Sequence, residues 1–208
     1  MSARVKICGI TRLEDALAAV DAGADALGFV FVPGTPRFIT AEAAAGIISA
    51  LPPFVSTVGL FVNASEDTID SHLRISRVQS VQLHGDESPE DSMKWLGRVR
   101  VLKAFRVRGP ETIQRLADYR FAADAFLLDA FVPGAHGGTG ARFDWELALA
   151  AKSAGRPLIL AGGITPQNVA EAVARVRPDA VDVSSGVESS PGKKDAAKIR
   201  ALIQAVRS

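Results

Sequence analysis

Two side chains in this sequence have the types and places that acid–base chemistry needs. Cys8 ends a short apolar run near the N-terminus, and Asp129 ends the apolar run AFLLD in the second half of the chain. A thiol can act as a base or as a nucleophile. A carboxyl group that ends so apolar a run is shielded from water on one side, which favours the protonated form that a general acid needs. A small buried hydrophobe and a helix-capping aspartate are the alternative interpretations.

Three glycine-bearing segments late in the sequence could bind a phosphate group. They are HGGTG at 136–140, GG at 162–163 and SSG at 184–186. Glycine lets the main chain approach an anion closely, and hydroxyl groups add hydrogen-bond donors. Ordinary turns would use the same residue types. The candidate phosphate ligands are Gly138, Thr139, Gly140, Gly162, Gly163, Ser184, Ser185 and Gly186.

Other polar residues near the ends of apolar runs are less specific. Arg37 lies in a loop, where its guanidinium could hold a carboxylate or a phosphate, or could simply lie in solvent. His84 and Asp182 also lie in or next to apolar runs, and we interpret both as structural or supporting residues. His72 and His136 lack a Cys, Asp or His partner at metal-binding spacing. We therefore predict no metal site.

The elements that must position these residues follow a regular rhythm. An apolar, β-branched run followed by a helix-like stretch recurs eight times. The runs begin near Arg4, Ala26, Ser56, Val78, Arg100, Ala125, Pro157 and Ala180. Each interval accommodates one strand, one crossover helix and two short loops, so the sequence predicts an α/β fold, a closed (β/α)8 TIM barrel. An open, doubly wound sheet is the alternative.

Capping signals indicate where several of the helices begin. Ser88 before Pro89 is typical of a helix N-terminus, and Thr40 precedes another helical stretch. Thr11, with Glu14 three residues later, predicts a capping box for the first helix. In a barrel, the loops that precede these helices lie at the C-terminal ends of the strands, which is the face where such folds carry their chemistry.

Bulk composition sets further bounds on the class of protein. With 208 residues, we expect one domain that spans 1–208. A net charge of +1 gives no sign of a nucleic-acid or acidic-membrane partner, and the apolar runs are too short to cross a bilayer. Cys8 is the only cysteine, so no intramolecular disulfide can form, and a cytoplasmic location fits best.

Taken together, the motifs resemble one family along almost the whole chain. They are KICG at 6–9, ALGFVF at 26–31 with Pro36 and Arg37, QLHG at 82–85, LD at 128–129, GGTG at 137–140 with FDW at 143–145, LAGG at 160–163 and DVSSGVE at 182–188. In this order they resemble phosphoribosylanthranilate isomerase, an enzyme family of tryptophan biosynthesis. Singly, most of these motifs would be unspecific, but jointly they are highly specific.

The resemblance implies an Amadori rearrangement of N-(5-phosphoribosyl)anthranilate. In such a family the residue matching Asp129 is the general acid that protonates the furanose ring oxygen, and the residue matching Cys8 is the general base that removes the proton from C2′ of the ribose. The resemblance implies no metal and no organic cofactor. We expect a small-molecule substrate, no nucleic-acid or membrane partner, and a monomer or a homodimer.

Two other functions compete with this interpretation. The first is another barrel enzyme that binds a phosphosugar, such as an indole-glycerol-phosphate synthase or a histidine-pathway isomerase. The latter would be expected to have an aspartate where this chain has Cys8. The second is a non-catalytic barrel that binds a phosphorylated ligand, and the presence of both Cys8 and Asp129 argues against it.

Overall fold

A computed structural model describes residues 2–130 and 145–208 and shows a closed barrel of eight parallel strands. Each strand pairs with the next along the chain, and β8 pairs with β1. The strands are β1 (Arg4–Cys8), β2 (Ala26–Val30), β3 (Ser56–Phe61), β4 (Ser80–Leu83), β5 (Arg100–Val107), β6 (Ala125–Ala130), β7 (Leu158–Leu160) and β8 (Ala180–Val183). The predicted (β/α)8 barrel is thus confirmed.

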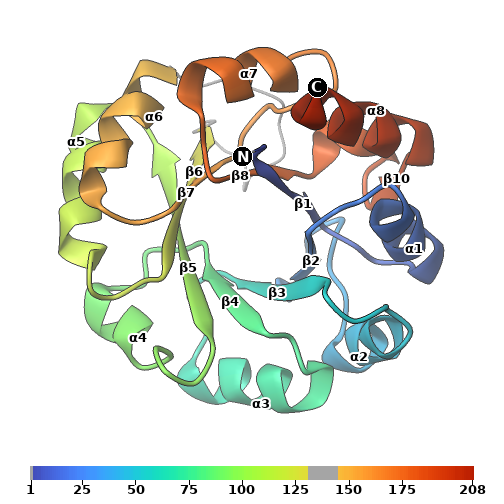
Figure 1. The fold of residues 1–208 in the computed structure, drawn as a ribbon. Coiled ribbons are helices and arrows are strands. Elements are labelled where there is room, and N and C mark those ends of the chain that lie inside the picture. Colours follow the sequence, from blue (N-terminus) through green and yellow to red (C-terminus); the bar gives the residue numbers. More distant parts are fainter. Residues whose placement is uncertain (1, 131–144) are drawn as a thin grey trace.

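Helices surround the barrel as an outer ring, and Figure 1 shows them in a view along the barrel axis. They are α1 (Leu13–Asp21), α2 (Ala41–Ser49), α3 (Glu66–Ser76), α4 (Pro89–Met93), α5 (Pro110–Gln114), α6 (Trp145–Ala151), α7 (Val169–Val176) and α8 (Ala196–Arg207), with short 3-10 turns at Arg115–Tyr119, Lys152–Ala154 and Ser185–Val187. No helix in the described part of the chain is long and apolar enough to cross a membrane.

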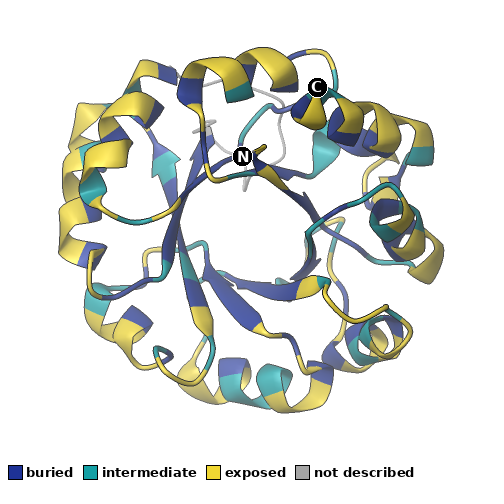
Figure 2. Cartoon of the chain, in the orientation of Figure 1, coloured by how far each residue is buried: buried dark blue, intermediate teal, exposed yellow. Residues whose placement is uncertain are grey.

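The strands form because their side chains can be buried on both faces of the sheet. In β6, Phe126, Leu127 and Leu128 are all fully buried, some facing the barrel interior and some facing the helices. Figure 2 shows the consequence, with a dark ring of buried strands inside helices whose outer faces are exposed. Near-continuous apolar runs are therefore the correct pattern for this parallel barrel.

Most strand positions agree with the rhythm of the sequence. Six of the eight strands begin at the predicted residue, whereas β4 and β7 begin slightly later, at Ser80 and Leu158. The sequence did not predict a small antiparallel hairpin of β9 (Glu188–Ser190) and β10 (Lys193–Lys194) after β8. Its strands are only two or three residues long, which is too short to show a periodicity.

The helix caps agree with the prediction in two of the three places named. Thr40 and Ser88 cap α2 and α4 through their hydroxyl groups, and Ser88 forms a full capping box. The predicted cap at Thr11 is wrong. Its hydroxyl donates to the Gly192 carbonyl at 2.7 Å, and α1 begins after Arg12 without a side-chain cap. A contact distant in sequence has therefore replaced the local one.

Candidate functional site

A cavity of about 320 Å³ opens at the C-terminal ends of the strands, and most of the predicted site residues line it. The predicted residues on its wall are Cys8, Arg37, Asp129, Gly162, Gly163, Ser184, Ser185 and Gly186. Gly138, Thr139 and Gly140 lie outside the described residues. Side chains from distant parts of the sequence thus meet at one face, as the barrel topology predicts.

Cys8 lies at the end of β1 in largely apolar surroundings. Its side chain is only 5% exposed and packs with Val30 and Leu60. Burial raises the pKa of the Cys8 thiol, and the positive charge of Lys6 opposes that rise. The thiol therefore lines the cavity on one side and contacts hydrophobic side chains on the other, and Lys6 is the cation that acts on it most strongly.

Lys6 lies two residues before Cys8 on the same strand and forms the centre of a buried polar cluster. Its ammonium Nζ donates to Oε1 of Gln82 and to Oδ1 of Asp182, both at 2.9 Å. Burial disfavours the charge of Lys6, but Asp182 and Cys8 together hold its pKa above the ordinary value. Asp182 is thus the ionic partner of Lys6 (Nζ to Oδ1, 2.9 Å), and its predicted supporting role has a structural basis.

Asp129 is the penultimate residue of β6 and faces the imidazole of His84, which directly follows β4. The carboxyl oxygen Oδ2 lies 3.4 Å from His84 Nε2, and Asp129 is only 6% exposed. On the other side of the ring, His84 Nδ1 lies 2.9 Å from Nε2 of Gln82. Because Gln82 accepts from Lys6 through its oxygen, its amide nitrogen is the donor to Nδ1. His84 Nε2, the ring nitrogen that lies near Asp129, is buried and forms no hydrogen bond within the described residues.

The guanidinium group of Arg37 is not free in solvent, because it already binds a carboxylate. Its Nε and Nη2 atoms donate to the two carboxylate oxygens of Glu188 at 2.8 and 2.7 Å. Lys194 donates to the same carboxylate at 2.9 Å. Burial opposes the charge of Glu188, but the hydrogen bonds from Arg37 and the charge of Lys194 hold its pKa below the usual value. The unpredicted β9–β10 hairpin supplies both Glu188 and Lys194 and so fixes the direction of Arg37.

The loops after β7 and β8 meet closely on the far side of the cavity. Gly162 and Gly163 adopt positive φ angles of 77° and 68°, which side chains with a Cβ rarely tolerate. A Cβ on Gly186 would lie 2.0 Å from the Ile164 carbonyl oxygen. Nearby, the hydroxyl of Ser184 is buried and has no hydrogen-bond partner among the described residues. This corner therefore offers main-chain approach and an unused donor to a ligand.

Sequence reasoning missed several polar residues of the cavity region. They are Lys6, Gln82, Arg106, Glu188 and Lys194. For Lys6 a signal existed, because a lysine in the middle of a buried strand needs a partner in the folded protein. Arg106 lies on β5, and its Nη2 donates to the His84 carbonyl at 3.3 Å. No signal in the sequence indicates that Glu188 bonds to Arg37.

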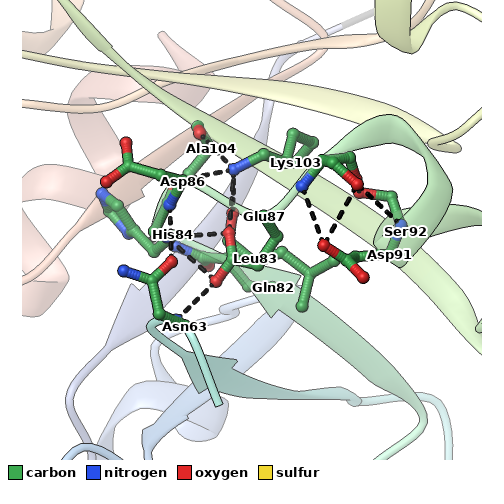
Figure 3. A network of polar contacts seen from close by, with 12 residues as sticks. Asn63, Gln82, Leu83, His84, Asp86, Glu87, Asp91, Ser92, Lys103 and Ala104 are labelled. Atoms are coloured by element: carbon green, nitrogen blue, oxygen red, sulfur yellow. Dashed lines mark hydrogen bonds and ion pairs between the residues drawn. The ribbon is translucent and has the colours of Figure 1, made fainter. Parts of the chain in front are cut away.

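A second buried lysine lies in β5, outside the cavity. Lys103 Nζ donates to Oε2 of Glu87 at 3.0 Å and to the Gly85 carbonyl at 2.9 Å. Glu87 in turn accepts from the main-chain nitrogens of Asn63 and Gly85. Figure 3 shows how these contacts converge on the loop that follows β4, next to His84. The network braces the loop from behind the site.

The described residues contain no group of three or more His, Cys, Asp or Glu side chains that could hold a metal ion. Lys6, Arg37 and Lys194 are each paired with a carboxylate. Arg106 on the cavity wall instead donates to a main-chain carbonyl, and its buried Nε has no hydrogen-bond partner among the described residues. What faces the cavity is a thiol, a carboxyl group and a glycine-rich corner with an unused hydroxyl donor. Such a set can move protons and bind an anion.

Comparison with known proteins gives consistent matches. The profile of the N-(5'phosphoribosyl)anthranilate (PRA) isomerase family matches residues 5–205. The N-(5'-phosphoribosyl)anthranilate isomerase of Citrifermentans bemidjiense is 61% identical, over 96% of this chain and 95% of that protein. The crystal structure of phosphoribosyl anthranilate isomerase from Thermotoga maritima has a TM-score of 0.93 and 46% identity, with 99% and 98% of the two chains covered.

A further solved phosphoribosyl anthranilate isomerase is in complex with reduced 1-(o-carboxyphenylamino)-1-deoxyribulose 5-phosphate. It has a TM-score of 0.89 and 44% identity, and the match covers 99% of this chain and 98% of that one. The likeness therefore extends over the whole barrel, the end that carries the cavity included.

Proposed function

Because this chain belongs to the N-(5′-phosphoribosyl)anthranilate isomerase family, we propose that Cys8 and Asp129 are the base and the acid of its reaction. The enzyme converts N-(5′-phosphoribosyl)anthranilate into 1-(2-carboxyphenylamino)-1-deoxyribulose 5-phosphate, an intramolecular aldose–ketose isomerisation in tryptophan biosynthesis. One observation carries the assignment of the two residues. Cys8 and Asp129, from β1 and β6, face one cavity beside a glycine-rich corner.

Asp129 acts first, as the general acid. Its carboxyl proton goes to the furanose ring oxygen, the bond from that oxygen to C1′ breaks, and the nitrogen lone pair forms a Schiff base. The His84 imidazole, 3.4 Å from Oδ2, faces one carboxyl oxygen and leaves the other to donate to the substrate. His84 therefore orients the acid, which agrees with the supporting role that we predict for it.

Cys8 completes the isomerisation as the general base. Its thiolate takes the proton from C2′, and the electrons of that C–H bond move toward the protonated imine, which gives an enolamine. This intermediate becomes the ketone by proton transfer to carbon. A thiolate with few hydrogen bonds in an apolar pocket is a competent base, because water does not stabilise its charge.

The apolar part of the cavity suggests where the aromatic half of the substrate binds. Beside Cys8, the cavity wall includes Val30 and Leu60, with Val32 and Val62 above them. We expect the anthranilate ring to pack here. Arg37 follows β2 on the same side, and it keeps Nη1 for a ligand while Glu188 binds its other two nitrogens. We predict that Arg37 contacts the anthranilate carboxylate.

We place the substrate phosphate over the loops after β7 and β8. The buried Ser184 hydroxyl without a partner and the positive-φ glycines Gly162 and Gly163 support this position. Gly186→Val should raise KM strongly, because a Cβ there would strike the Ile164 carbonyl and move the loop. Inorganic phosphate should compete with substrate in the wild type and less well in this variant. A phosphate bound at the opposite end of the barrel would contradict the proposal.

Removal of each proton-transfer group tests the acid–base assignment. The substrate's anthranilate-type fluorescence reports turnover. General acid–base assistance contributes about 10² to 10⁴-fold. Cys8→Ala and Asp129→Asn should therefore each lower kcat by at least about 10²-fold with the fold intact by circular dichroism. Cys8→Ser, a volume-matched control, should fail equally because a hydroxyl is a far weaker base. Near-normal turnover in a folded Cys8→Ala enzyme would overturn the role of the thiol.

The pH dependence offers a second test of the pair. Activity needs deprotonated Cys8 and protonated Asp129 in the same molecule, so the kcat/KM profile should be bell-shaped. Because the two groups face one cavity, the apparent pKa values from the two limbs of the profile belong to the pair and not to single residues. The profile of Cys8→Ala should lose one limb. A wild-type rate that rises without a maximum would contradict an acid–base pair.

We further infer that residues 1–208 form one domain, since the strands at both ends of the sequence pair in the same barrel. The enzyme acts on a small molecule. A cytoplasmic location and a monomer or homodimer remain predictions, which cell fractionation and sedimentation would test. A non-catalytic barrel that binds a phosphorylated ligand, or another phosphosugar enzyme, would show no turnover in the fluorescence assay.

A further inference from the structure

The proposed base lies where a thiolate is difficult to form. Cys8 is almost fully buried and packs with the apolar side chains of Val30 and Leu60. Charge in such surroundings is strongly disfavoured unless a counter-charge is near. The protein must therefore supply a cation that stays next to the sulfur atom while the proton moves.

Three cations act on Cys8, and each of them is paired with a carboxylate. Arg37 and Lys194 both bind the carboxylate of Glu188, Arg37 through two hydrogen bonds and Lys194 at 2.9 Å. These two cations share that one carboxylate, which fixes the direction of both side chains. Lys6 is the third, and it is the cation that acts most strongly on the thiol. The other charged group acting on Cys8 is Asp182, the partner of Lys6.

The strand geometry places Lys6 and Cys8 side by side. Residues two apart on a strand point to the same face, so both side chains point into the barrel from β1. The neighbouring strand carries Gly28 in register with Cys8. A Cβ on Gly28 would lie 2.8 Å from the Cys8 sulfur and 3.1 Å from Lys6 Nζ. Because this position holds only a hydrogen atom, no side chain of β2 separates the ammonium from the thiol.

The ammonium group also has a donor to spare. A lysine ammonium has three N–H donors. Two of them go to Gln82 and Asp182, which come from β4 and β8 and fix Nζ inside the barrel. The third is available to the sulfur atom of Cys8. Lys6 is therefore fixed by two partners, has one N–H donor left, and is the cation that acts most strongly on the thiol.

From this arrangement we propose that Lys6 is a positioning residue that holds the Cys8 thiolate by charge and by one N–H donor, while Asp182 and Gln82 keep its ammonium in place. The proposal rests on Cys8 as the base in the proposed function. Lys6 touches no reacting atom. It makes the deprotonated thiol available in a pocket that would otherwise keep it neutral. Gly28 belongs to the same device, because any side chain there would push the two groups apart.

Titration of the thiol tests this directly, because Cys8 is the only cysteine of the chain. Thiolate absorbance near 240 nm and the rate of alkylation by iodoacetamide, each measured against pH, then report on Cys8 alone. In Lys6→Met the titration midpoint should move upward by about one to three pH units. In Lys6→Arg it should remain within about half a pH unit of wild type, because this variant keeps the cation. At neutral pH, alkylation should slow about tenfold for every pH unit by which the midpoint rises.

Two further variants keep the test decisive. Lys103→Met removes another buried lysine of a barrel strand, which contacts Glu87 instead of Cys8, and should leave the midpoint unchanged. Lys6→Met leaves Asp182 buried without its partner, so it could fail to fold. The double variant Lys6→Met/Asp182→Asn removes both charges. It should still raise the midpoint, by less, because Lys6 acts on the thiol more strongly than Asp182 does.

An unchanged midpoint in folded Lys6→Met, or in the double variant if the single one does not fold, would overturn the proposal. An equal rise of the midpoint in Lys103→Met would also overturn it, because the effect would then be general. These readouts need no turnover, so they separate this inference from the proposed function. If Cys8→Ala remained active, the role of Cys8 as the base would fail, whatever the thiol titration gave.

Discussion

Two of the barrel strands each carry a buried lysine, and the two lysines have different surroundings. Lys6 and Lys103 lie within strands, are 4% and 2% exposed, and each pairs with a carboxylate at about 3 Å. Their other partners differ. Lys6 bonds to the side chains of Gln82 and Asp182 at the cavity, whereas Lys103 donates mostly to main-chain carbonyls of the β4 loop and its own strand.

The pKa values of the two lysines are shifted in opposite directions. Burial lowers the pKa of Lys103, and the single carboxylate of Glu87 does not restore it. Lys6 is buried as deeply, yet Asp182 and Cys8 raise its pKa. A buried charge is therefore not by itself a sign of catalysis. What distinguishes the two lysines is that Lys6 lies next to the thiol of Cys8, while Lys103 faces the main chain of a loop.

The largest effect is expected from loss of Lys103, which should lower stability but not catalysis. Lys103→Met leaves Glu87 buried without its cation, and breaking such a pair costs about 3–5 kcal/mol of unfolding free energy. Urea unfolding followed by circular dichroism would measure the loss. Lys193→Met, at an exposed lysine of the β9–β10 hairpin, is the control and should be neutral. At temperatures where Lys103→Met is folded, a large fall in kcat would contradict the bracing role.

A substitution of one glycine in each lysine network would disturb the packing there without removing a polar group. A Cβ on Gly28 would press on Cys8 and Lys6, and a Cβ on Gly85 would lie 2.2 Å from Oδ1 of Asn63 in the loop that Lys103 braces. Gly28→Ala should lower kcat by about 10²-fold, because misplacement of a catalytic group by about 1 Å costs that much. Gly85→Ala should mainly lower stability, by about 1–3 kcal/mol. An equal loss of kcat in the Gly28→Ala and Gly85→Ala variants would contradict the different roles of the two lysine networks.

The barrel and the meeting of the main site residues could be predicted from the sequence. The eight strands repeat one buried pattern, and the barrel topology then brings Cys8, Asp129 and the late glycines to one face. Pairings between side chains from distant strands leave no such pattern. Lys6 with Asp182, and Arg37 with Glu188, depend on the three-dimensional register, and the short β9–β10 hairpin has no periodicity of its own.

A smaller effect is expected at the rim of the cavity. Arg37→Ala should raise KM about tenfold or more with a smaller change in kcat, because a hydrogen bond to a charged group is worth about 1.5–3 kcal/mol. Steady-state kinetics with the fluorescence assay would measure both constants. Arg37→Lys, which keeps the charge but loses the fork, should fall between the two enzymes. A kcat/KM within about twofold of wild type in Arg37→Ala would refute the contact with substrate.

The smallest expected effect is at the exposed edge of the bracing region. Asp91 completes the capping box of α4, where it accepts from the main-chain nitrogen and the hydroxyl of Ser88 and from Lys94. The hydrogen bond from Lys94, with those from Ser88, lowers the pKa of Asp91 below its ordinary value of 3.8. A carboxylate with a lowered pKa stabilises the fold fully above its unfolded value and loses that contribution as pH falls through its folded value.

Asp91→Asn should therefore lower the unfolding free energy at neutral pH by under about 1 kcal/mol. The deficit should shrink below about pH 4, where the wild type loses the same contribution. Thermal unfolding of both proteins between neutral and acid pH would show the two stability curves converging. Asp21→Asn, at an exposed residue that ends α1, controls for net charge and should run parallel to wild type. Because α4 lies behind the site, kcat should not change, and a loss of turnover in Asp91→Asn would mean that this edge, too, positions the catalytic groups.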